Sequence, residues 1–264
     1  MKISIITPVY NDPRVSKALD SILCQEYEGE IELIVIDGGS DTPTLDILQK
    51  YQDRISVFVS EPDNGVYDAM NKGIKFATGD IIGILNADDR YCNPFVLRDV
   101  ANAFKDSQTD ACYGDLVYID HQDRIVRYWK SGQCRLWKFY FGWMPPHPTF
   151  FVRKQLYEKC GIFDLRYPIA ADYELMLRFI LKYRISVKYI PRVLVKMSIG
   201  GKSNRSLSNV VKANIEVWQA WKNNDLSFGY LVPLLKPAQK VVQFIRARSK
   251  KLSQPVDGIT NGVR

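Results

Sequence analysis

An amide and two adjacent carboxylates follow a short apolar run and give the chain its clearest chemical signal. The run from Ile81 to Leu85 ends in the sequence Asn-Ala-Asp-Asp at residues 86–89. Buried carboxylates are unfavourable unless a positive group neutralises them, and oxygen atoms clustered at a strand end can hold a divalent cation together with substrate phosphates and water. The alternative is structural, since Asp often caps turns and helices. The Gly- and Asn-containing segment just upstream, residues 60–73, favours a site.

Alternating strands and helices are expected to position these residues. Short runs of apolar residues predict buried strands, and apolar residues at helical spacing predict the helices between them. The predicted strands are residues 3–9, 31–36, 55–59 and 80–85, and the predicted helices lie at about 15–23, 45–51 and 67–77. Apolar strands that alternate with helices indicate an α/β fold with a mostly parallel sheet covered on both faces. Such sheets bind ligands beyond the carboxyl ends of their strands, where the polar segments 8–11, 37–40 and 86–89 are all expected.

The second half of the chain is less regular. We expect a strand at 111–119, a helix at 171–183, a strand at 187–190 and a loop at 200–203. Seven aromatic residues lie between Tyr128 and Trp143. Aromatic residues at that density usually form core, although here they could also line a groove for a sugar or a lipid.

Composition limits the class of protein. The 264 residues, 46% hydrophobic and 25% charged, indicate a globular protein with one large domain, or one domain and a tail. The net charge of +7 suits an anionic partner without choosing among nucleotides, acidic lipids and nucleic acid. Five widely spaced cysteines without a Cys-x-x-Cys pair argue against a disulfide framework or a zinc site. No signal peptide and no apolar run of about 20 residues is recognised, so we expect a cytoplasmic protein.

The C-terminal tail has a different character from the rest of the chain. Between Leu226 and Val256 there are six basic residues and no acidic one, with an apolar group at residues 241–245. A basic amphipathic helix is typical of binding to a membrane surface, and the alternative is a helix packed on the body of the protein. The tail lacks the interleaved aromatic residues of nucleic-acid stacking platforms, so no nucleic-acid partner is expected.

With these segments in place, the chain resembles the family-two glycosyltransferases of the GT-A fold. Within them it resembles the bacterial subgroup that builds O-antigen, capsular and colanic-acid-type polysaccharides. The matching segments occur in the family's order at 4–11, 32–40, 60–73, 79–80, 85–89, 113–115, 146–147, 161–164, 171–174 and 200–203. The resemblance implies a GT-A domain at 1–205, with a nucleotide-binding half at about 1–115 and an acceptor-side half at about 116–205. A helical, basic amphipathic tail would follow at 206–264.

The resemblance assigns a nucleotide site to the ends of the first two strands. Pro8, Val9 and Tyr10 would contact the base and ribose, and Asp37 would hydrogen-bond to one of them. Asp37 also precedes two glycines, which favour a tight turn in any case. By the same resemblance Asp63, Asp68 and Lys72 would touch the nucleotide or a phosphate, although the amides of a helix N-terminus could serve an anion instead.

The segment after the fourth strand matches the position of the family's Asp-x-Asp metal motif. Asn86 departs from the general pattern because an amide brings no charge, although Asn occurs there in the subgroup. Asp88 is therefore expected to be the principal ligand of a Mg²⁺ or Mn²⁺ ion that bridges the diphosphate. Asn86 and Ala87 would line the donor, and Asp89 would orient the donor sugar or the water on the metal.

Asp172 matches the family's catalytic base. It would take a proton from an acceptor hydroxyl during a single in-line displacement with inversion at the anomeric carbon, through a state like that of glycoside hydrolysis. The alternative is a helix N-cap, because Asp172 begins an apolar-periodic segment, and Glu174 is the reserve candidate. His147 matches a histidine on the acceptor side of the subgroup and could contact the acceptor, the diphosphate or the metal, or be structural.

Together these features predict a metal-dependent, inverting glycosyltransferase. Its donor would be a nucleotide-diphosphate sugar, with uridine diphosphate the first choice, and its acceptor a glycan or lipid-linked saccharide at the cytoplasmic face of the membrane. A sugar nucleotidyltransferase would need a glycine- and basic-rich first loop, and a dinucleotide oxidoreductase would need Gly-x-Gly-x-x-Gly. Neither pattern follows the first strand. An inactive nucleotide- or glycan-binding module gains some support from Asn86, but the presence of Asp88, Asp89 and Asp172 argues against it.

Overall fold

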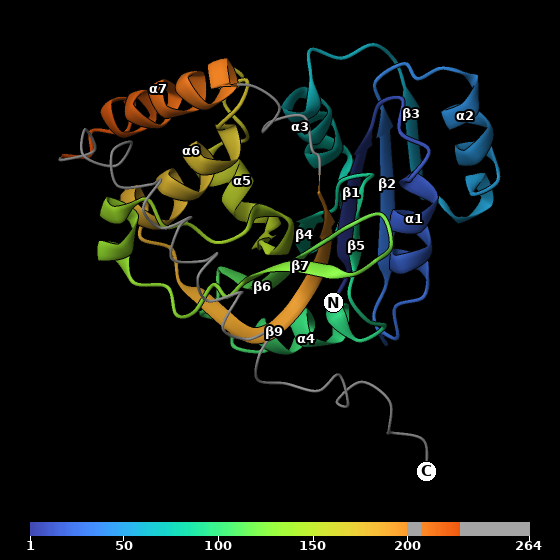
Figure 1. Ribbon diagram of the computed structural model, residues 1–264. Coiled ribbons are helices and arrows are strands. Elements are labelled where there is room, and N and C mark those ends of the chain that lie inside the picture. The colour runs from blue at the N-terminus through green and yellow to red at the C-terminus, as the bar shows by residue number, and fades with distance from the viewer. Residues whose placement is uncertain (200–206, 228–264) are drawn as a thin grey trace.

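The computed structural model describes residues 1–199 and 207–227 (Figure 1). Its strands form one mixed sheet with the order β3-β2-β1-β4-β8-β6-β9-β5, and β7 pairs with β6. The strands are β1 Ile3–Val9, β2 Ile31–Asp37, β3 Val57–Ser60, β4 Ile81–Ile84, β5 Asp89–Tyr91, β6 Ala111–Ile119, β7 Ile125–Trp129, β8 Phe151–Arg153 and β9 Val187–Ser198. The α-helices are α1 Val15–Leu23, α2 Thr42–Gln49, α3 Val66–Phe76, α4 Val96–Ala103, α5 Lys154–Cys160, α6 Ala171–Leu177 and α7 Leu207–Asn223. Short 3-10 segments are η1 Gln52–Arg54, η2 Leu136–Phe141 and η3 His147–Thr149, and a π-helical turn, η4 Arg178–Lys182, continues α6.

Parallel pairing is concentrated in the first half of the chain. β1 pairs in parallel with β2 and with β4, and β2 pairs in parallel with β3. The carboxyl ends of these strands therefore meet at one edge of the sheet. Antiparallel pairings of β8 with β4 and β6 join this half to the second, in which β6 and β9 are parallel. The expected α/β fold is confirmed.

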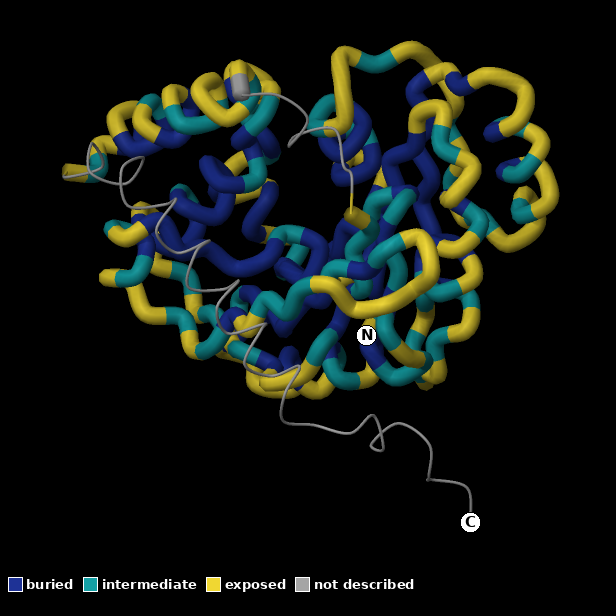
Figure 2. The backbone as a smooth tube through the Cα atoms, in the orientation of Figure 1, coloured by how far each residue is buried: buried dark blue, intermediate teal, exposed yellow. Residues whose placement is uncertain are grey.

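Two hydrophobic cores lie on opposite faces of the sheet because neighbouring strand residues alternate between the faces. Ile5 of β1 packs in the core that contains α1 and α4, whereas Ile6 packs in the core that contains α3, α5, α6 and α7. Figure 2 shows the central strands of the sheet buried, and exposed positions along the outer helices α2 and α7. Helices thus cover both faces of the parallel half, as the sequence predicts.

The first half follows the predicted elements closely and the second half less so. β1 has the predicted bounds, and α3 and β4 differ from them by about one residue at an end. The predicted helix at 171–183 divides into α6 and η4, and the predicted strand at 187–190 is the start of the longer β9. The short elements β5, β7, β8, α4 and α5 were not predicted.

Two predicted features lie outside the described residues. These are the loop at 200–203 and the basic segment from residue 228 onward. Within the described part of the chain, no helix is long and apolar enough to cross a membrane.

Candidate active site

Asp37 is the last residue of β2, and its carboxylate is fully buried with only one of its two oxygens hydrogen-bonded. Its Oδ2 accepts hydrogen bonds from the amides of Gly39 (3.2 Å) and Ser40 (3.0 Å) and from the hydroxyl of Ser60 (2.7 Å). Its Oδ1 is buried with no hydrogen-bond partner among the described residues. A buried oxygen without a donor is costly, so this atom is available to a donor group on a ligand.

The loop from Ser60 to Gly65 lies beside Asp37 and leads into α3. Asp63 accepts from the Gly65 amide (2.8 Å), and Asp68 accepts from the Asn64 amide (3.0 Å). Gly65 has a φ of 111°, which a residue with a side chain rarely adopts. A Cβ at Gly38 would lie 2.5 Å from Asp63 Oδ2, so the loop after β2 and this loop approach closely.

Lys72 on α3 contacts the same loop. Its Nζ lies 2.8 Å from Glu61 and donates to the carbonyl of Pro62 (3.1 Å). The Glu61 carboxylate raises the pKa of Lys72. Asp63, Asp68 and Lys72 therefore share one role in the structure, which is to shape the loop at residues 60–65. Whether they also touch a nucleotide stays a prediction.

The end of β1 completes this part of the edge. Pro8 and Val9 are buried, whereas Tyr10 is half exposed beyond the strand. The Asn11 amide donates to Ser40 Oγ (2.8 Å), which fixes the loop after β1 to the loop after β2. The predicted nucleotide-contacting residues of β1 and β2 are thus neighbours at one edge of the sheet.

The segment after β4 carries a second set of buried, unsatisfied oxygens. Asn86 Nδ2 donates to Asp89 Oδ2 (3.2 Å), which leaves Asn86 Oδ1 and Asp89 Oδ1 buried without partners among the described residues. Burial raises the pKa of Asp89 well above its usual value, and the neighbouring charge of Asp88 raises it further. Ala87 is buried, and Asp88 keeps 18% of its side chain exposed. Of this segment's two carboxylates, Asp88 is therefore the one that a solvated ligand reaches.

Arg14 lies beside this segment and was not predicted as a site residue. It forms a bidentate pair with Asp12, and its Nη2 lies 3.5 Å from Asp88 Oδ2. A shallow cleft joins Arg14, Asp88 and Asp89 to the 120–123 turn between β6 and β7. The only sequence signal for Arg14 is its place as the first cation after β1.

Asp172 lies in the first turn of α6 and contacts the nucleotide half through α3. Its Oδ1 accepts from the amide of Tyr173 (2.8 Å) and lies 3.1 Å from the hydroxyl of Tyr67, which is also 3.0 Å from the carbonyl of Ile169. The N-cap position is Ala170, so the alternative in which Asp172 is the cap is wrong. Burial raises the pKa of Tyr67, and the charge of Asp172 adds to this effect, so the hydroxyl stays protonated as a donor.

His147 joins this cluster through Phe163, and its contact with an acceptor stays a prediction. Its ring meets Phe163 edge-on at 5.6 Å, and Phe163 stacks on Tyr67 at 5.5 Å. Burial lowers the pKa of His147, which the nearby charge of Asp172 partly opposes. A neutral imidazole beside a carboxylate can donate or accept a hydrogen bond near pH 7.

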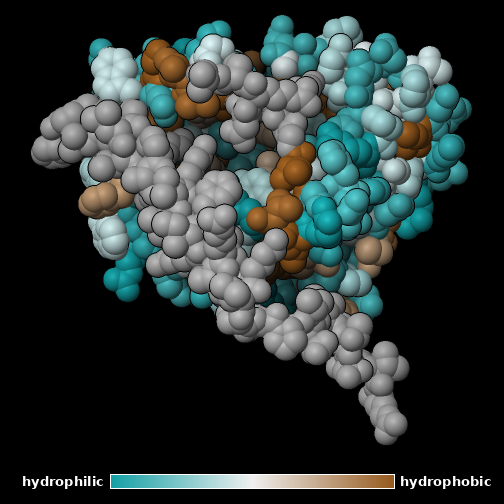
Figure 3. Space-filling view, viewed as in Figure 1, coloured by the Kyte–Doolittle hydropathy of each residue, from teal (hydrophilic) through white to brown (hydrophobic). Residues whose placement is uncertain are grey.

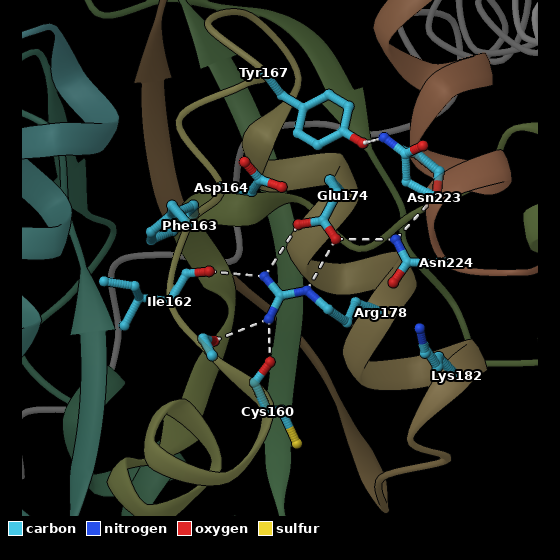
Figure 4. Close-up of polar contacts among 12 residues, drawn as sticks. Cys160, Ile162, Phe163, Asp164, Tyr167, Glu174, Arg178, Lys182, Asn223 and Asn224 are labelled. Atoms are coloured by element: carbon cyan, nitrogen blue, oxygen red, sulfur yellow. Dashed lines mark hydrogen bonds and ion pairs between the residues drawn. The ribbon is translucent and has the colours of Figure 1, made fainter.

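Glu174, the reserve candidate for the base, belongs to a different network (Figure 4). It forms a bidentate pair with Arg178 (2.9 and 3.0 Å) and accepts from Asn224 (2.9 Å). The Arg178 guanidinium also donates to three consecutive backbone carbonyls, at residues 160–162. Glu174 is therefore a satisfied structural carboxylate, and it lies away from Asp172 on α6.

Tyr67 is the residue of this site that sequence reasoning missed. It lies within the matching segment at 60–73, but nothing in the sequence showed that it would face a residue more than 100 positions later. The signal could have been an aromatic hydroxyl in the first turn of a helix that begins at a binding loop.

Comparison with known proteins agrees with this geometry. The glycosyl transferase family 2 model matches residues 4–164. The chain belongs to glycosyl transferase family 2. It is 34% identical over 183 residues to an uncharacterized glycosyltransferase of Mycobacterium tuberculosis, covering 67% of this chain and 68% of that protein. It is 32% identical over 207 residues to a PGL/p-HBAD biosynthesis glycosyltransferase of Mycobacterium bovis, covering 76% and 78%.

Solved structures share the fold of this family 2 glycosyltransferase. Residues 1–349 of Staphylococcus aureus TarS superpose with a TM-score of 0.65 at 19% identity, covering 98% of this chain and 76% of that one. The mannosyltransferase PcManGT from Pyrobaculum calidifontis, solved with GDP-Man and Mn²⁺, has a TM-score of 0.65 at 16% identity, covering 96% and 76%. At these identities the likeness establishes the GT-A fold of the chain.

Proposed function

We propose that the protein transfers a sugar from a nucleotide-diphosphate donor to a hydroxyl of a glycan or lipid-linked saccharide, with inversion at the anomeric carbon. The contact between Tyr67 and Asp172 carries this proposal. Tyr67 lies in the first turn of α3, the helix that follows the loop beside Asp37, so the contact links Asp172 to that loop. This link supports a base within reach of a donor bound at Asp37 and the 86–89 segment, whose buried oxygens have no partner among the described residues.

The donor's nucleotide is assigned to the ends of β1 and β2. Asp37 Oδ1 accepts a hydrogen bond from the base or ribose, and Tyr10 lies beside the base at the mouth of the site. A uracil ring offers an N–H donor that suits Asp37. TarS has been solved with UDP-GlcNAc, and PcManGT with GDP-Man. We therefore propose a uridine diphosphate sugar as donor, with a guanosine diphosphate sugar as the competitor to test.

The residues after β4 fit a hard divalent cation. Carboxylate and amide oxygens are the ligands that Mg²⁺ and Mn²⁺ prefer. In the described part of the chain no group of three or more His, Cys, Asp or Glu side chains could hold a metal on its own. Asp88 would therefore hold the ion together with the donor's phosphates, with Asn86 and Asp89 beside it. A bound ion offsets the charge that develops on the departing diphosphate.

Asp172 acts as the base. It accepts the proton of the acceptor hydroxyl as that oxygen attacks the anomeric carbon, and the bond to the diphosphate breaks on the opposite face. Tyr67 donates to the charged carboxylate and so holds it in place before the proton arrives. His147 lies on the side from which the acceptor approaches and is assigned to orient its hydroxyl.

The wider setting is cell-surface polysaccharide synthesis at the cytoplasmic face of the membrane. The segments shared with the O-antigen and colanic-acid subgroup support it, and so does the basic composition of the 206–264 tail. If the tail carries membrane binding, a chain truncated after Ser227 will lose it.

Asp172→Asn tests the catalytic assignment directly. We expect turnover of the matched donor and acceptor to fall about 10²- to 10⁴-fold, as for loss of a general base, while calorimetry shows unchanged donor binding. Glu174→Gln is the comparison variant. It should be less stable, but its folded molecules should turn over the donor as fast as the wild type does. Product from the wild-type protein should show inverted anomeric configuration by NMR. Equal turnover by Asp172→Asn and wild type would refute the assignment, and donor binding without turnover for any acceptor would favour an inactive binding module.

A further inference from the structure

Helix α7 carries apolar side chains on two opposite faces. Val217, Ala220 and Trp221 are buried against the body of the protein. On the other side Val211, Ile215 and Trp218 follow one another at helical spacing and are 42–59% exposed; we call these three the outer stripe of α7. Hydrophobic surface along α7 is visible at the upper left of Figure 3. A surface helix normally pairs one apolar face with a polar one, so a second apolar face marks a contact with something outside the fold.

The η2 segment adds an exposed aromatic pair beside α7. Trp137 and Phe141 meet edge-on at 5.9 Å, and each is about half exposed. Tyr140, from the same segment, packs on Trp221 with ring centroids 4.9 Å apart, so η2 lies against α7. This contact is made through the buried side of α7, so the exposed aromatic pair is a separate apolar group from the outer stripe. The aromatic-rich stretch, expected to be core or groove, is thus buried in part and exposed here.

The charges around these apolar residues have one sign. The ionisable side chains of α7 and η2 are three lysines, Lys138, Lys212 and Lys222, and a single acid, Glu216. Glu216 is only 7% exposed, because it accepts from the backbone amides of Ile169 and Ala170. Lys138 of η2 donates to the carbonyl of Gln133 (2.7 Å), so the outward-facing charge is that of Lys212 and Lys222 on α7.

We propose that the outer stripe of α7 lies on an anionic lipid surface, with Lys212 and Lys222 against its headgroups. Exposed tryptophan and aliphatic side chains among lysines are the composition of interfacial segments, in which apolar groups enter the acyl boundary and lysines meet anionic headgroups. A second copy of the same face would bring lysine against lysine. The anionic bilayer is the occupant that complements both the apolar and the charged parts.

Contact with a membrane at this face would orient the acceptor half. Trp221 Nε1 donates to the hydroxyl of Tyr173 (2.8 Å), and Glu216 holds the residues that precede α6. The helix on the membrane is thus fixed directly to the helix that carries Asp172. The proposal concerns binding alone and does not depend on the identity of donor or acceptor.

The test is sedimentation of the full chain with vesicles of phosphatidylcholine alone or with phosphatidylglycerol. We expect binding to the anionic vesicles that weakens as salt is added. Ile215→Gln/Trp218→Gln should reduce the partition coefficient at least about tenfold, from the apolar area withdrawn. A separate double variant, Lys212→Gln/Lys222→Gln, should also reduce the partition coefficient, by about fivefold for each lysine. Phe76→Gln, an equally exposed aromatic at the end of α3, is the matched control and should bind as wild type does.

Several outcomes would overturn the proposal. These are no binding of the wild type to anionic vesicles, unchanged binding by Ile215→Gln/Trp218→Gln, and an equal loss with Phe76→Gln. A wild-type dimer that this double variant converts to a monomer, as measured by light scattering, would show instead that a second copy covers the face. Loss of all binding on truncation after Ser227 would assign the contact to residues 228–264 and not to α7. Thermal melting and donor binding of each variant show separately that the fold and the nucleotide site are intact.

Discussion

Two groups of buried carboxylates in this molecule differ in whether their oxygens are satisfied. Away from the carboxyl edge of the parallel strands, Glu174 is matched by Arg178 and Asn224, and Asp115 accepts from the hydroxyls of Tyr128 and Tyr189 and the amide of Ser131. At the carboxyl edge of the parallel strands, Asp37 and Asp89 each keep one buried oxygen without a partner among the described residues.

The presence or absence of hydrogen-bond partners distinguishes carboxylates that stabilise the fold from those that can bind a ligand. A buried polar atom without a partner costs free energy, and such atoms persist where a ligand supplies the missing contact. By this criterion we propose the edge with Asp37, Asn86 and Asp89 as the ligand site.

Breaking the Glu174 network should have the largest effect on stability. Arg178→Met leaves a buried carboxylate unpaired and frees the carbonyls of residues 160–162, so we expect a loss of about 3–5 kcal/mol in the free energy of unfolding. For a chain of this size the melting temperature should fall by about 10 °C. The control is Arg166→Met, which removes the exposed pair with Asp164 and should cost less than 1 kcal/mol. Equal melting temperatures for the two variants would contradict the distinction.

Tyr67→Phe should impair catalysis more than folding. Removing the hydroxyl takes one hydrogen bond from a charged carboxylate, which is worth about 1.5–3 kcal/mol, so kcat should fall at least about tenfold with little change in the donor's KM. Steady-state kinetics of the variant measures this separation of kcat from KM. Tyr113→Phe removes a comparable hydroxyl from the Gly132 carbonyl (2.6 Å) and should leave kcat unchanged. An unchanged kcat in Tyr67→Phe would leave Tyr67 a packing residue only.

Asp89→Asn should stabilise the protein while lowering its activity. The substitution removes a buried charge next to Asp88, whose proximity already disfavours ionisation of Asp89. We expect a gain of about 1 kcal/mol in the free energy of unfolding, in line with stability lost for function at active sites. In the matched variant, Asp115→Asn, both oxygens of the original carboxylate accept hydrogen bonds, so the substitution should destabilise the protein. Denaturant titration distinguishes them, and destabilisation of both variants to the same extent would count against the comparison.

The parallel half and its ligand edge could be predicted from the sequence because their signals are local. Apolar runs mark β1, β2 and β4, and each ends in the polar residues that meet at the edge. Contacts across the chain could not be predicted in this way. Three such contacts depend on how distant segments pack: Arg14 with Asp88, Tyr67 with Asp172, and the Glu174–Arg178–Asn224 network. The residue types at these positions are common in ordinary structural roles, so they do not indicate the contacts. The outer stripe of α7 was missed because apolar spacing alone indicates a buried face.

Nucleotide binding at the carboxyl edge is the central claim, and thermal unfolding measures it most directly. The wild type should be melted with uridine, guanosine, thymidine and cytidine diphosphates, each with and without Mn²⁺. At about 100 times its dissociation constant, one nucleotide should add about 2.7 kcal/mol and raise the melting temperature by several degrees, with Mn²⁺ required. Asp37→Asn and Asp88→Asn should lose that shift, whereas Arg166→Met should keep it. No shift with any nucleotide, or a full shift in both aspartate variants, would contradict the account.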